Sequence, residues 1–150
     1  EVASVRVPVG VPAAQARPLS PKWRLSPVAS KILGIPQEGW VQGVRVGGVV
    51  LVGMPFDTSG ELTREWRIQA EQEGWDLWVT SFSGAYLGYM SPDRYYNVVD
   101  DKGRLDYETG LMGWLGPQTE AYFASLMKQM IRNFGSPPPA LSAVTAPAAV

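Results

Sequence analysis

Two loops of this sequence carry side chains that could do chemistry together. Residues 54–61 (MPFDTSGE) contain a carboxylate, Asp57, and residues 81–89 (SFSGAYLGY) end in a phenol, Tyr89. Ligands of parallel α/β sheets bind where the strands end, because loops and helix N-termini converge there. Each loop follows a strand-like segment, and two neighbouring parallel strands would place the loops side by side. Asp57 and Tyr89 are therefore expected to face one site.

The residue types that are missing narrow the chemistry. The 150 residues include no cysteine and no histidine. The chain therefore has no disulfide and no thiolate nucleophile, and it lacks the imidazole that most often serves as a base near neutral pH. Any reaction carried out by these residues alone must use carboxylate, hydroxyl, phenol, Lys or Arg groups.

Charge and hydropathy argue against two classes of partner. Thirteen basic and fourteen acidic residues give a net charge of -1 without a basic run, so no nucleic-acid partner is predicted. The longest apolar stretch, Val44 to Met54, falls short of the roughly 20 residues that a membrane span needs, so the chain is not predicted to be transmembrane. It starts at Glu1 rather than Met and has no signal-peptide pattern, so we interpret it as a piece of something longer.

A βαβ unit is predicted in the middle of the chain. Val44 to Met54 is a nearly continuous β-branched run, typical of a strand covered on both faces, and Trp75 to Phe82 is a second strand. Between them, Thr58 and Glu61 have the spacing of a capping box, and Gly74 suits the position after a last helical residue. Two strands joined in this way are expected to be parallel with a right-handed crossover. The predicted fold class is therefore α/β.

The remaining segments divide into a lead-in, a C-terminal helix and a tail. Residues 1–40 are rich in proline and are expected to be irregular, apart from a first strand at their start. Residues 41–135 form the predicted domain, with a hairpin tip or loop at Val98 to Leu105 and a last helix from Pro117 to about Asn133. Residues 136–150 combine consecutive prolines with small residues, which predicts a disordered tail.

Three short runs resemble motifs of the neutral (non-lysosomal) ceramidase family. They are GMPFDTSGE at 53–61, YLGYMS at 86–91, and YE at 107–108 followed by GPQT at 116–119. The family has a Gly-Glu-Phe-Thr loop after a strand, then a Tyr-x-Gly-Tyr-x-Thr stretch, then Tyr-Glu and Gly-Pro-His-Thr. The matches come in the same order between Val41 and Ile131. The chain thus resembles the C-terminal portion of a ceramidase catalytic domain, part of a larger α/β hydrolase domain.

The resemblance implies roles for three residues. Asp57 takes the position of a zinc-binding glutamate, Tyr89 that of a tyrosine zinc ligand, and Tyr107 that of a tyrosine near the substrate carbonyl. Zinc held by two histidines, a carboxylate and a phenolate keeps an open position for water and lowers the pKa of that water. A phenol beside the carbonyl can donate to the developing oxyanion. The implied cofactor is Zn, and the implied substrate is ceramide or a related N-acyl lipid.

The sequence departs from the family pattern at positions that matter for this site. Asp57 stands where the family has glutamate, and the shorter carboxylate reaches less far. Gln118 replaces a histidine, and the loop between Tyr96 and Tyr107 is longer. Because the chain has no histidine, the zinc ligands would have to be completed by a preceding segment or a separate partner chain.

Simpler interpretations fit the same residues. Asp57 directly precedes a helix, where a carboxylate interacts favourably with the helix dipole. Tyr86, Tyr89, Tyr95 and Tyr96 could form an aromatic cluster that serves only for packing, since tyrosine buries its ring and keeps its hydroxyl in water.

Two hypotheses follow for the whole chain. In the first, it is the C-terminal part of a zinc-dependent amidohydrolase of the ceramidase type, acting on a lipid amide with a partner segment. In the second, it is a non-catalytic ceramidase-like structural or assembly subunit, as the missing histidines and the Asp57 departure suggest. The resemblance favours a secreted or periplasmic location over a cytoplasmic one.

Overall fold

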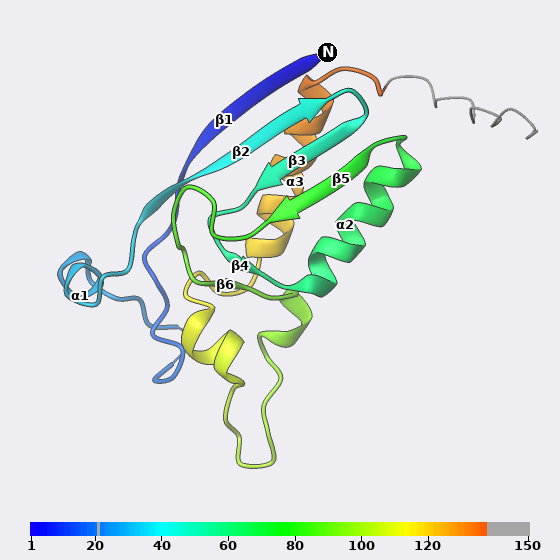
Figure 1. Ribbon diagram of the computed structural model, residues 1–150. Coiled ribbons are helices and arrows are strands. Elements are labelled where there is room, and N and C mark those ends of the chain that lie inside the picture. The colour runs from blue at the N-terminus through cyan, green and yellow to red at the C-terminus, as the bar shows by residue number, and fades with distance from the viewer. Residues whose placement is uncertain (21, 138–150) are drawn as a thin grey trace, which may run out of the picture.

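A computed structural model describes residues 1–20 and 22–137 as a mixed α/β fold (Figure 1), which confirms the predicted fold class. Its elements, in chain order, are the strand β1 (Val2–Gly10), the helix α1 (Pro27–Ile32), the strands β2 (Glu38–Val46), β3 (Val49–Gly53) and β4 (Asp57–Thr58), the helix α2 (Gly60–Gln72), the strands β5 (Asp76–Thr80) and β6 (Tyr89–Met90), the 3₁₀ turn η1 (Asp93–Tyr95), the π-helix η2 (Tyr107–Met112) and the helix α3 (Thr119–Asn133).

The main sheet has four strands in the order β1-β2-β3-β5. The strands β1, β2 and β3 pair antiparallel, whereas β3 and β5 pair parallel and are joined by α2. The predicted βαβ unit is therefore present. The first nine-residue strand of the lead-in pairs with β2 along its whole length, so residues 2–10 belong to the sheet.

The prediction of one strand from Val44 to Met54 is wrong. The chain turns back at Gly47, whose φ is 61°, and Val46 pairs with Val49 across an antiparallel hairpin. A glycine suits the first central position of such a two-residue hairpin turn, because that position needs a positive φ. Because apolar residues lie on both sides of Gly47 and Gly48, the hydropathy pattern alone does not reveal the turn.

The helix α2 begins at Gly60, where the sequence predicts its start, but a different residue caps it. Ser59, not Thr58, caps α2, and its hydroxyl accepts from the backbone N–H of Glu61 at 3.2 Å. Thr58 belongs to β4 instead, where its N–H donates to the Ser81 hydroxyl at 3.0 Å. The helix α3 begins at Thr119 rather than Pro117, after a residue in the left-handed region at Gln118.

One hydrophobic core lies between one face of the sheet and the helices α2 and α3, which lie behind and beside the strands in Figure 1. Phe56 and Phe123 meet edge to face in it, with ring centroids 4.8 Å apart. The core residues are Val9, Val41, Val50, Val52, Met54, Phe56, Leu62, Trp66, Ala70, Trp75, Leu77, Leu87, Met90, Leu115, Phe123, Met127, Met130, Ile131 and Phe134.

Below the main sheet in Figure 1 lie the loops and short helical segments that connect the strands, among them α1 and the hairpin of residues 98–106. The predicted hairpin tip is present: Val99 bridges Leu105, and the Asp100 carboxylate accepts from the backbone N–H groups of Lys102 and Arg104. The lead-in contributes α1, a short helix capped by Ser26, which interrupts the expected coil. The predicted tail spans residues 136–150, and its residues 138–150 lie outside the described part of the chain. Within the described part, no helix is long and apolar enough to cross a membrane.

Candidate functional site

The loops after β3 and β5 meet in a second, two-stranded sheet. Here β4 pairs parallel with β6, and Asp57 is the register partner of Tyr89. The Asp57 N–H donates to the Gly88 carbonyl at 3.0 Å, and the Ser59 N–H donates to the Met90 carbonyl at 2.9 Å. The carboxylate and the phenol expected to face one site thus lie opposite each other on adjacent strands.

Tyr107 joins them from a distant segment. Its ring meets the Tyr89 ring edge to face, with centroids 5.9 Å apart and an interplanar angle of 86°. It is the first residue of η2, and π-helical turns occur frequently at functional sites. The side chain is 58% exposed, so its hydroxyl is accessible to a ligand. The structure therefore brings Asp57, Tyr89 and Tyr107 together at one end of the sheet.

Gly88 explains how closely η2 approaches β6. A Cβ on Gly88 would lie 2.4 Å from the carbonyl oxygen of Met112, and its φ of 91° also disfavours other residues. Glycine is needed where two backbones approach this closely. Gly88 thus lets the strand that carries Tyr89 pack against the helix that carries Tyr107.

Arg17, a residue that the sequence did not single out, holds η2 from the other side. It is only 4% exposed, its Nε donates to the Thr109 carbonyl at 2.8 Å, and its guanidinium also donates to the Tyr96 carbonyl. Burial lowers the pKa of this guanidinium from its ordinary value. An isolated arginine in a proline-rich segment gives little signal in one sequence, because its acceptors are backbone carbonyls far along the chain.

Acidic groups lie close together at the site. Burial raises the pKa of Tyr89, and so do the neighbouring acidic groups of Asp57, Tyr107 and Glu108 and a hydrogen bond to Asp57. Burial and the charges of Tyr89, Asp57 and Tyr107 raise the pKa of Tyr86 in the same direction. These acidic groups oppose one another's ionisation, and a bound cation would relieve that opposition.

The donors present suit half of a zinc site. A carboxylate and a phenol are both oxygen ligands of a kind that zinc accepts, and neither Asp57 nor Tyr89 is fully buried. Among the described residues, however, no three His, Cys, Asp or Glu side chains are grouped so that they could hold a metal ion. Two further ligands would have to come from elsewhere.

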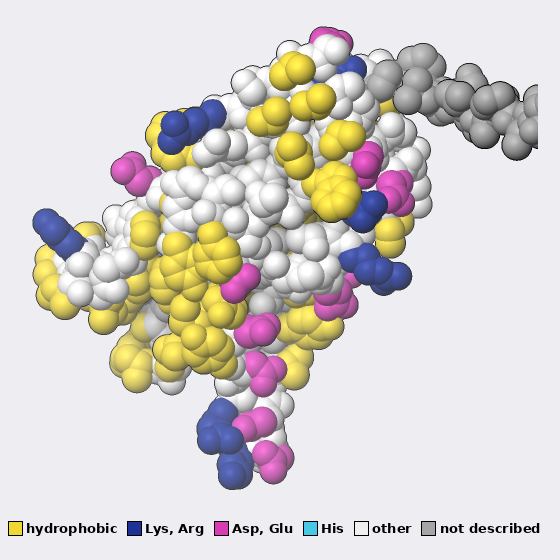
Figure 2. Space-filling model, in the orientation of Figure 1, with side chains coloured by type: hydrophobic (Ala, Val, Ile, Leu, Met, Phe, Trp, Pro, Cys, Tyr) yellow, Lys and Arg dark blue, Asp and Glu magenta, His cyan; other side chains and the backbone are white. Residues whose placement is uncertain are grey.

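The predicted cluster of four tyrosines is only partly right. Tyr95 donates to the Glu61 carboxylate at 3.0 Å, and Tyr96 is fully buried. Tyr86 packs instead with Phe82 and Trp114, each with its ring centroid 5.5 Å from the Tyr86 ring. Figure 2 shows hydrophobic side chains gathered on the part of this face below the sheet.

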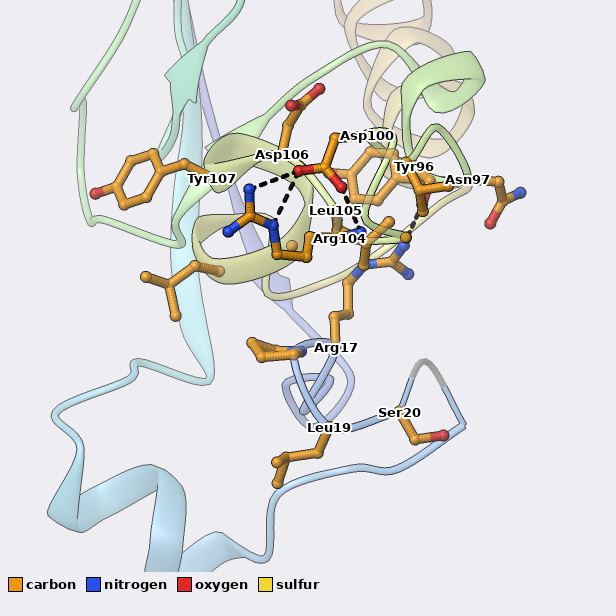
Figure 3. A pocket seen from close by; sticks show the side chains of 15 residues that line it. Arg17, Leu19, Ser20, Tyr96, Asn97, Asp100, Arg104, Leu105, Asp106 and Tyr107 are labelled. Carbon is orange, nitrogen blue, oxygen red and sulfur yellow. Dashed lines mark hydrogen bonds and ion pairs between the residues drawn. The ribbon is translucent and has the colours of Figure 1, made fainter.

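A cavity of about 950 Å³ lies beside Tyr107, between the lead-in and the hairpin of residues 98–106. Its lining includes Arg17, Leu19, Leu105 and Leu111. In Figure 3, Asp100 and Arg104 form an ion pair at its border, and the Tyr107 ring points away from them. Tyr107 therefore stands between this cavity and the Asp57–Tyr89 pair.

Solved structures with a similar fold are ceramidases. The neutral ceramidase from Pseudomonas aeruginosa aligns with 72% of this chain at 22% identity and a TM-score of 0.50. A ceramidase solved in complex with C2 aligns with 91% of this chain at 23% identity and a TM-score of 0.55. The chain has a ceramidase-like fold.

The similarity is limited in extent. This chain covers only 17% of the first solved structure and 22% of the second, so it spans about a fifth of their length. No family model and no curated protein sequence matches it. Gln118, which resemblance places at a histidine position, lines a separate cavity of about 300 Å³ with Tyr122 and Phe123.

Proposed function

We propose that this chain is the C-terminal part of a zinc-dependent amidohydrolase of the ceramidase type, and that it supplies one half of the active site. The observation that carries the proposal is the pairing of Asp57 with Tyr89 across β4 and β6, with the Tyr107 ring against Tyr89. Asp57 and Tyr89 were selected from the sequence by their strand-end loops and by resemblance, Tyr107 was selected by resemblance alone, and the three residues come from three separate segments. The ceramidase-like fold supports the same assignment.

In this proposal each residue has a separate task. Asp57 and Tyr89 are the oxygen ligands of the metal, and a bound cation would relieve the opposition between the acidic groups that raises the pKa of Tyr89. Bound zinc would supply Lewis acidity and an activated water. Tyr107, with its exposed hydroxyl, donates a hydrogen bond to the carbonyl oxygen of the substrate amide as negative charge develops there.

The proposal requires a partner that brings imidazoles. The chain contains no histidine, so two ligands would come from an upstream segment or a separate chain. The substrate we propose is a lipid amide such as ceramide, because the exposed rings of Phe82 and Tyr107 border the site with apolar surface. A secreted or periplasmic location is proposed on the resemblance alone.

The test is metal content and amide hydrolysis in the assembly that contains this chain and its histidine-bearing partner. We expect one zinc per site, and we expect Asp57→Asn and Tyr89→Phe to reduce zinc affinity by more than the roughly 10–100-fold that loss of a supporting contact costs. Tyr107→Phe should keep the zinc and reduce kcat by about 100–1,000-fold.

Matched variants control for general damage. Asp101→Asn changes an exposed carboxylate of the hairpin, and Tyr122→Phe changes an exposed phenol of α3. Both should leave zinc content and hydrolysis unchanged. A folded assembly that binds no zinc, or that is indifferent to the Asp57 and Tyr89 changes, would contradict the proposal.

The second candidate is a non-catalytic, ceramidase-like assembly subunit. The absence of histidine from the chain and the aspartate at position 57 favour it. It predicts that the natural partner lacks paired histidines and that the assembly hydrolyses no N-acyl lipid. Sequencing the partner in the purified assembly separates the two candidates.

A further inference from the structure

The lead-in differs in charge from the rest of the chain. Residues 2–37 contain no Asp or Glu, although the chain has fourteen acidic residues in all. The same stretch holds five basic residues, which are Arg6, Arg17, Lys22, Arg24 and Lys31. Arg17 is buried and Arg6 lies over the Trp40 ring, whereas the other three are exposed. None of these three forms an ion pair with another residue that the structure describes.

The same part of the chain also exposes large apolar side chains. Six large hydrophobic residues of the described chain are more than 60% exposed, and five of them lie between positions 19 and 33. These five are Leu19, Trp23, Val28, Ile32 and Leu33. A single exposed apolar residue is ordinary, but a group of them on one segment marks an interaction site.

A short hairpin and the helix α1 present these side chains. Residues 14–25 double back as a hairpin, which the bridge between Gln15 and Arg24 closes. Val28 and Ile32 are four residues apart on α1, so they share one of its faces. In Figure 1, α1 stands out from the body of the molecule, and Figure 2 shows hydrophobic side chains over it with a basic one at the margin. We call the following residues the lead-in patch: Leu19, Lys22, Trp23, Arg24, Val28, Lys31, Ile32 and Leu33.

We propose that the lead-in patch binds the surface of a lipid bilayer that contains anionic lipids. Its three cations meet the phosphates of the head groups, while its apolar side chains enter the boundary between head groups and acyl chains. Trp23 suits that boundary, because its ring is apolar and its N–H is polar. The long stems of Lys22 and Lys31 lie along apolar surface and keep their ammonium groups in water.

Other occupants fit the lead-in patch less well. A protein surface, including another part of a longer protein, would bury three cations among apolar side chains and would have to supply a carboxylate for each. A second copy of the patch cannot do so, because the patch contains no acidic residue and would meet like charges. A nucleic acid would pair with the cations but leave the aliphatic side chains in water. An anionic bilayer offers both phosphate and hydrocarbon.

The lead-in patch adjoins the cavity of about 950 Å³. Leu19 belongs to both, and two further exposed apolar residues, Val99 and Leu111, line the same cavity. The acidic residues of the lining, Asp100 and Asp106, lie at the other end of it from Leu19 in Figure 3. A bilayer on the patch would therefore lie beside this cavity. The inference does not rest on the proposed function, because binding to a bilayer needs neither zinc nor turnover.

The test is co-sedimentation of the chain with phospholipid vesicles. We expect tighter binding to vesicles of phosphatidylcholine with phosphatidylglycerol than to vesicles of phosphatidylcholine alone, and weaker binding in high salt. The double variant Lys22→Gln/Lys31→Gln should raise the Kd for the anionic vesicles by roughly tenfold or more. Its matched control is Lys128→Gln/Arg132→Gln, which removes the same charge from α3, behind the main sheet, and should weaken binding far less.

Apolar variants test whether the patch enters the bilayer. Trp23→Ser and Ile32→Ser should each raise the Kd by roughly tenfold, and this effect should persist in high salt because salt does not screen apolar contacts. Trp78→Ser is the matched control, since Trp78 is also an exposed tryptophan but lies on β5. Circular dichroism establishes that each variant is folded.

Several results would overturn the proposal. One is a folded chain that ignores anionic vesicles, and another is binding that the patch variants and their controls weaken equally. A third is an assembly with the histidine-bearing partner that no longer binds vesicles, because the partner would then cover the patch. Self-association that Ile32→Ser abolishes, without vesicle binding, would show that a second copy is the occupant. An assembly that binds vesicles but neither zinc nor substrate would contradict only the proposed function.

Discussion

At the scale of single residues, the site is held by side chains that take no part in the proposed chemistry. Arg17 shows this most directly. It is buried and donates to the backbone carbonyls of Thr109 and Tyr96, so it ties η2 to the turn that follows β6. A residue of this kind sets where Tyr107 lies without touching a ligand.

Replacing Arg17 with alanine should cost about 3 kcal/mol of unfolding free energy, because hydrogen bonds to a charged donor are lost and buried carbonyls are left without a partner. Urea denaturation measures it. Arg24→Ala is the control, because Arg24 is exposed and makes one long hydrogen bond of 3.3 Å to the Ala13 carbonyl. Equal losses in the two variants would contradict the assignment.

Tyr96 should make the fold sensitive to alkali. Burial raises the pKa of Tyr96 to about 12. Because this pKa lies above the unfolded value of about 10, the stability from keeping the phenol neutral is complete below about pH 10 and is lost as the pH rises through about 12.

The loss from Tyr96 ionisation should approach about 2–3 kcal/mol above that range. Tyr96→Phe removes this contribution, so the difference in unfolding free energy between wild type and variant should shift across the same range. Tyr122→Phe, at an exposed position, should show no such shift. Urea denaturation at a series of pH values decides between these outcomes.

At the scale of elements, the sequence predicted the helices and strands that follow a local periodic pattern. It missed the features that arise where distant segments pack closely together. The helix α2 and the strand β5 follow local periodicity, and both were predicted. The β2–β3 hairpin was missed because Gly47 and Gly48 lie inside an apolar run. The helix η2 packs against Gly88 and accepts a hydrogen bond from Arg17, and no local sequence pattern predicts these contacts between distant segments.

Gly88→Ala should separate β6 from η2. It adds a clash with the Met112 carbonyl at 2.4 Å to the strain of a positive φ, so we expect a loss of roughly 2–4 kcal/mol. Gly103→Ala is the matched control, since Gly103 also has a positive φ of 73° but would meet no atom within 4 Å. That variant should lose only about 1 kcal/mol. Thermal or urea unfolding of both variants tests the difference.

At the scale of the whole molecule, the fold and the grouping of site residues were accessible from the sequence, whereas the surfaces were not. The strand-end loops and the resemblance selected Asp57 and Tyr89, and the resemblance alone selected Tyr107. The pairing of β4 with β6 and the position of η2 bring the three together. One apolar surface feature is visible only from strand register, which places Val44, Leu51 and Trp78 in one row across the sheet. Register depends on pairing between distant segments, so a single sequence does not reveal it.

The isolated chain should fold without metal. Its core lies between the sheet and two helices, and among the described residues no three His, Cys, Asp or Glu side chains are grouped to hold a metal ion. A chelator should therefore leave the unfolding free energy unchanged, and zinc alone should not produce amide hydrolysis. Urea denaturation with and without EDTA, and an assay on an N-acyl lipid with added zinc, test this. Unfolding by EDTA would show that the ligand set is more complete than the described residues suggest.

The burial of Arg17 also fixes an order of events during synthesis. Its two backbone acceptors lie 79 and 92 residues further along the chain. A nascent chain therefore cannot form these two hydrogen bonds until Tyr96 and Thr109 have left the ribosome, and loops that long close slowly. The segment that carries Tyr107 thus becomes rigid late, after the βαβ unit has had time to form.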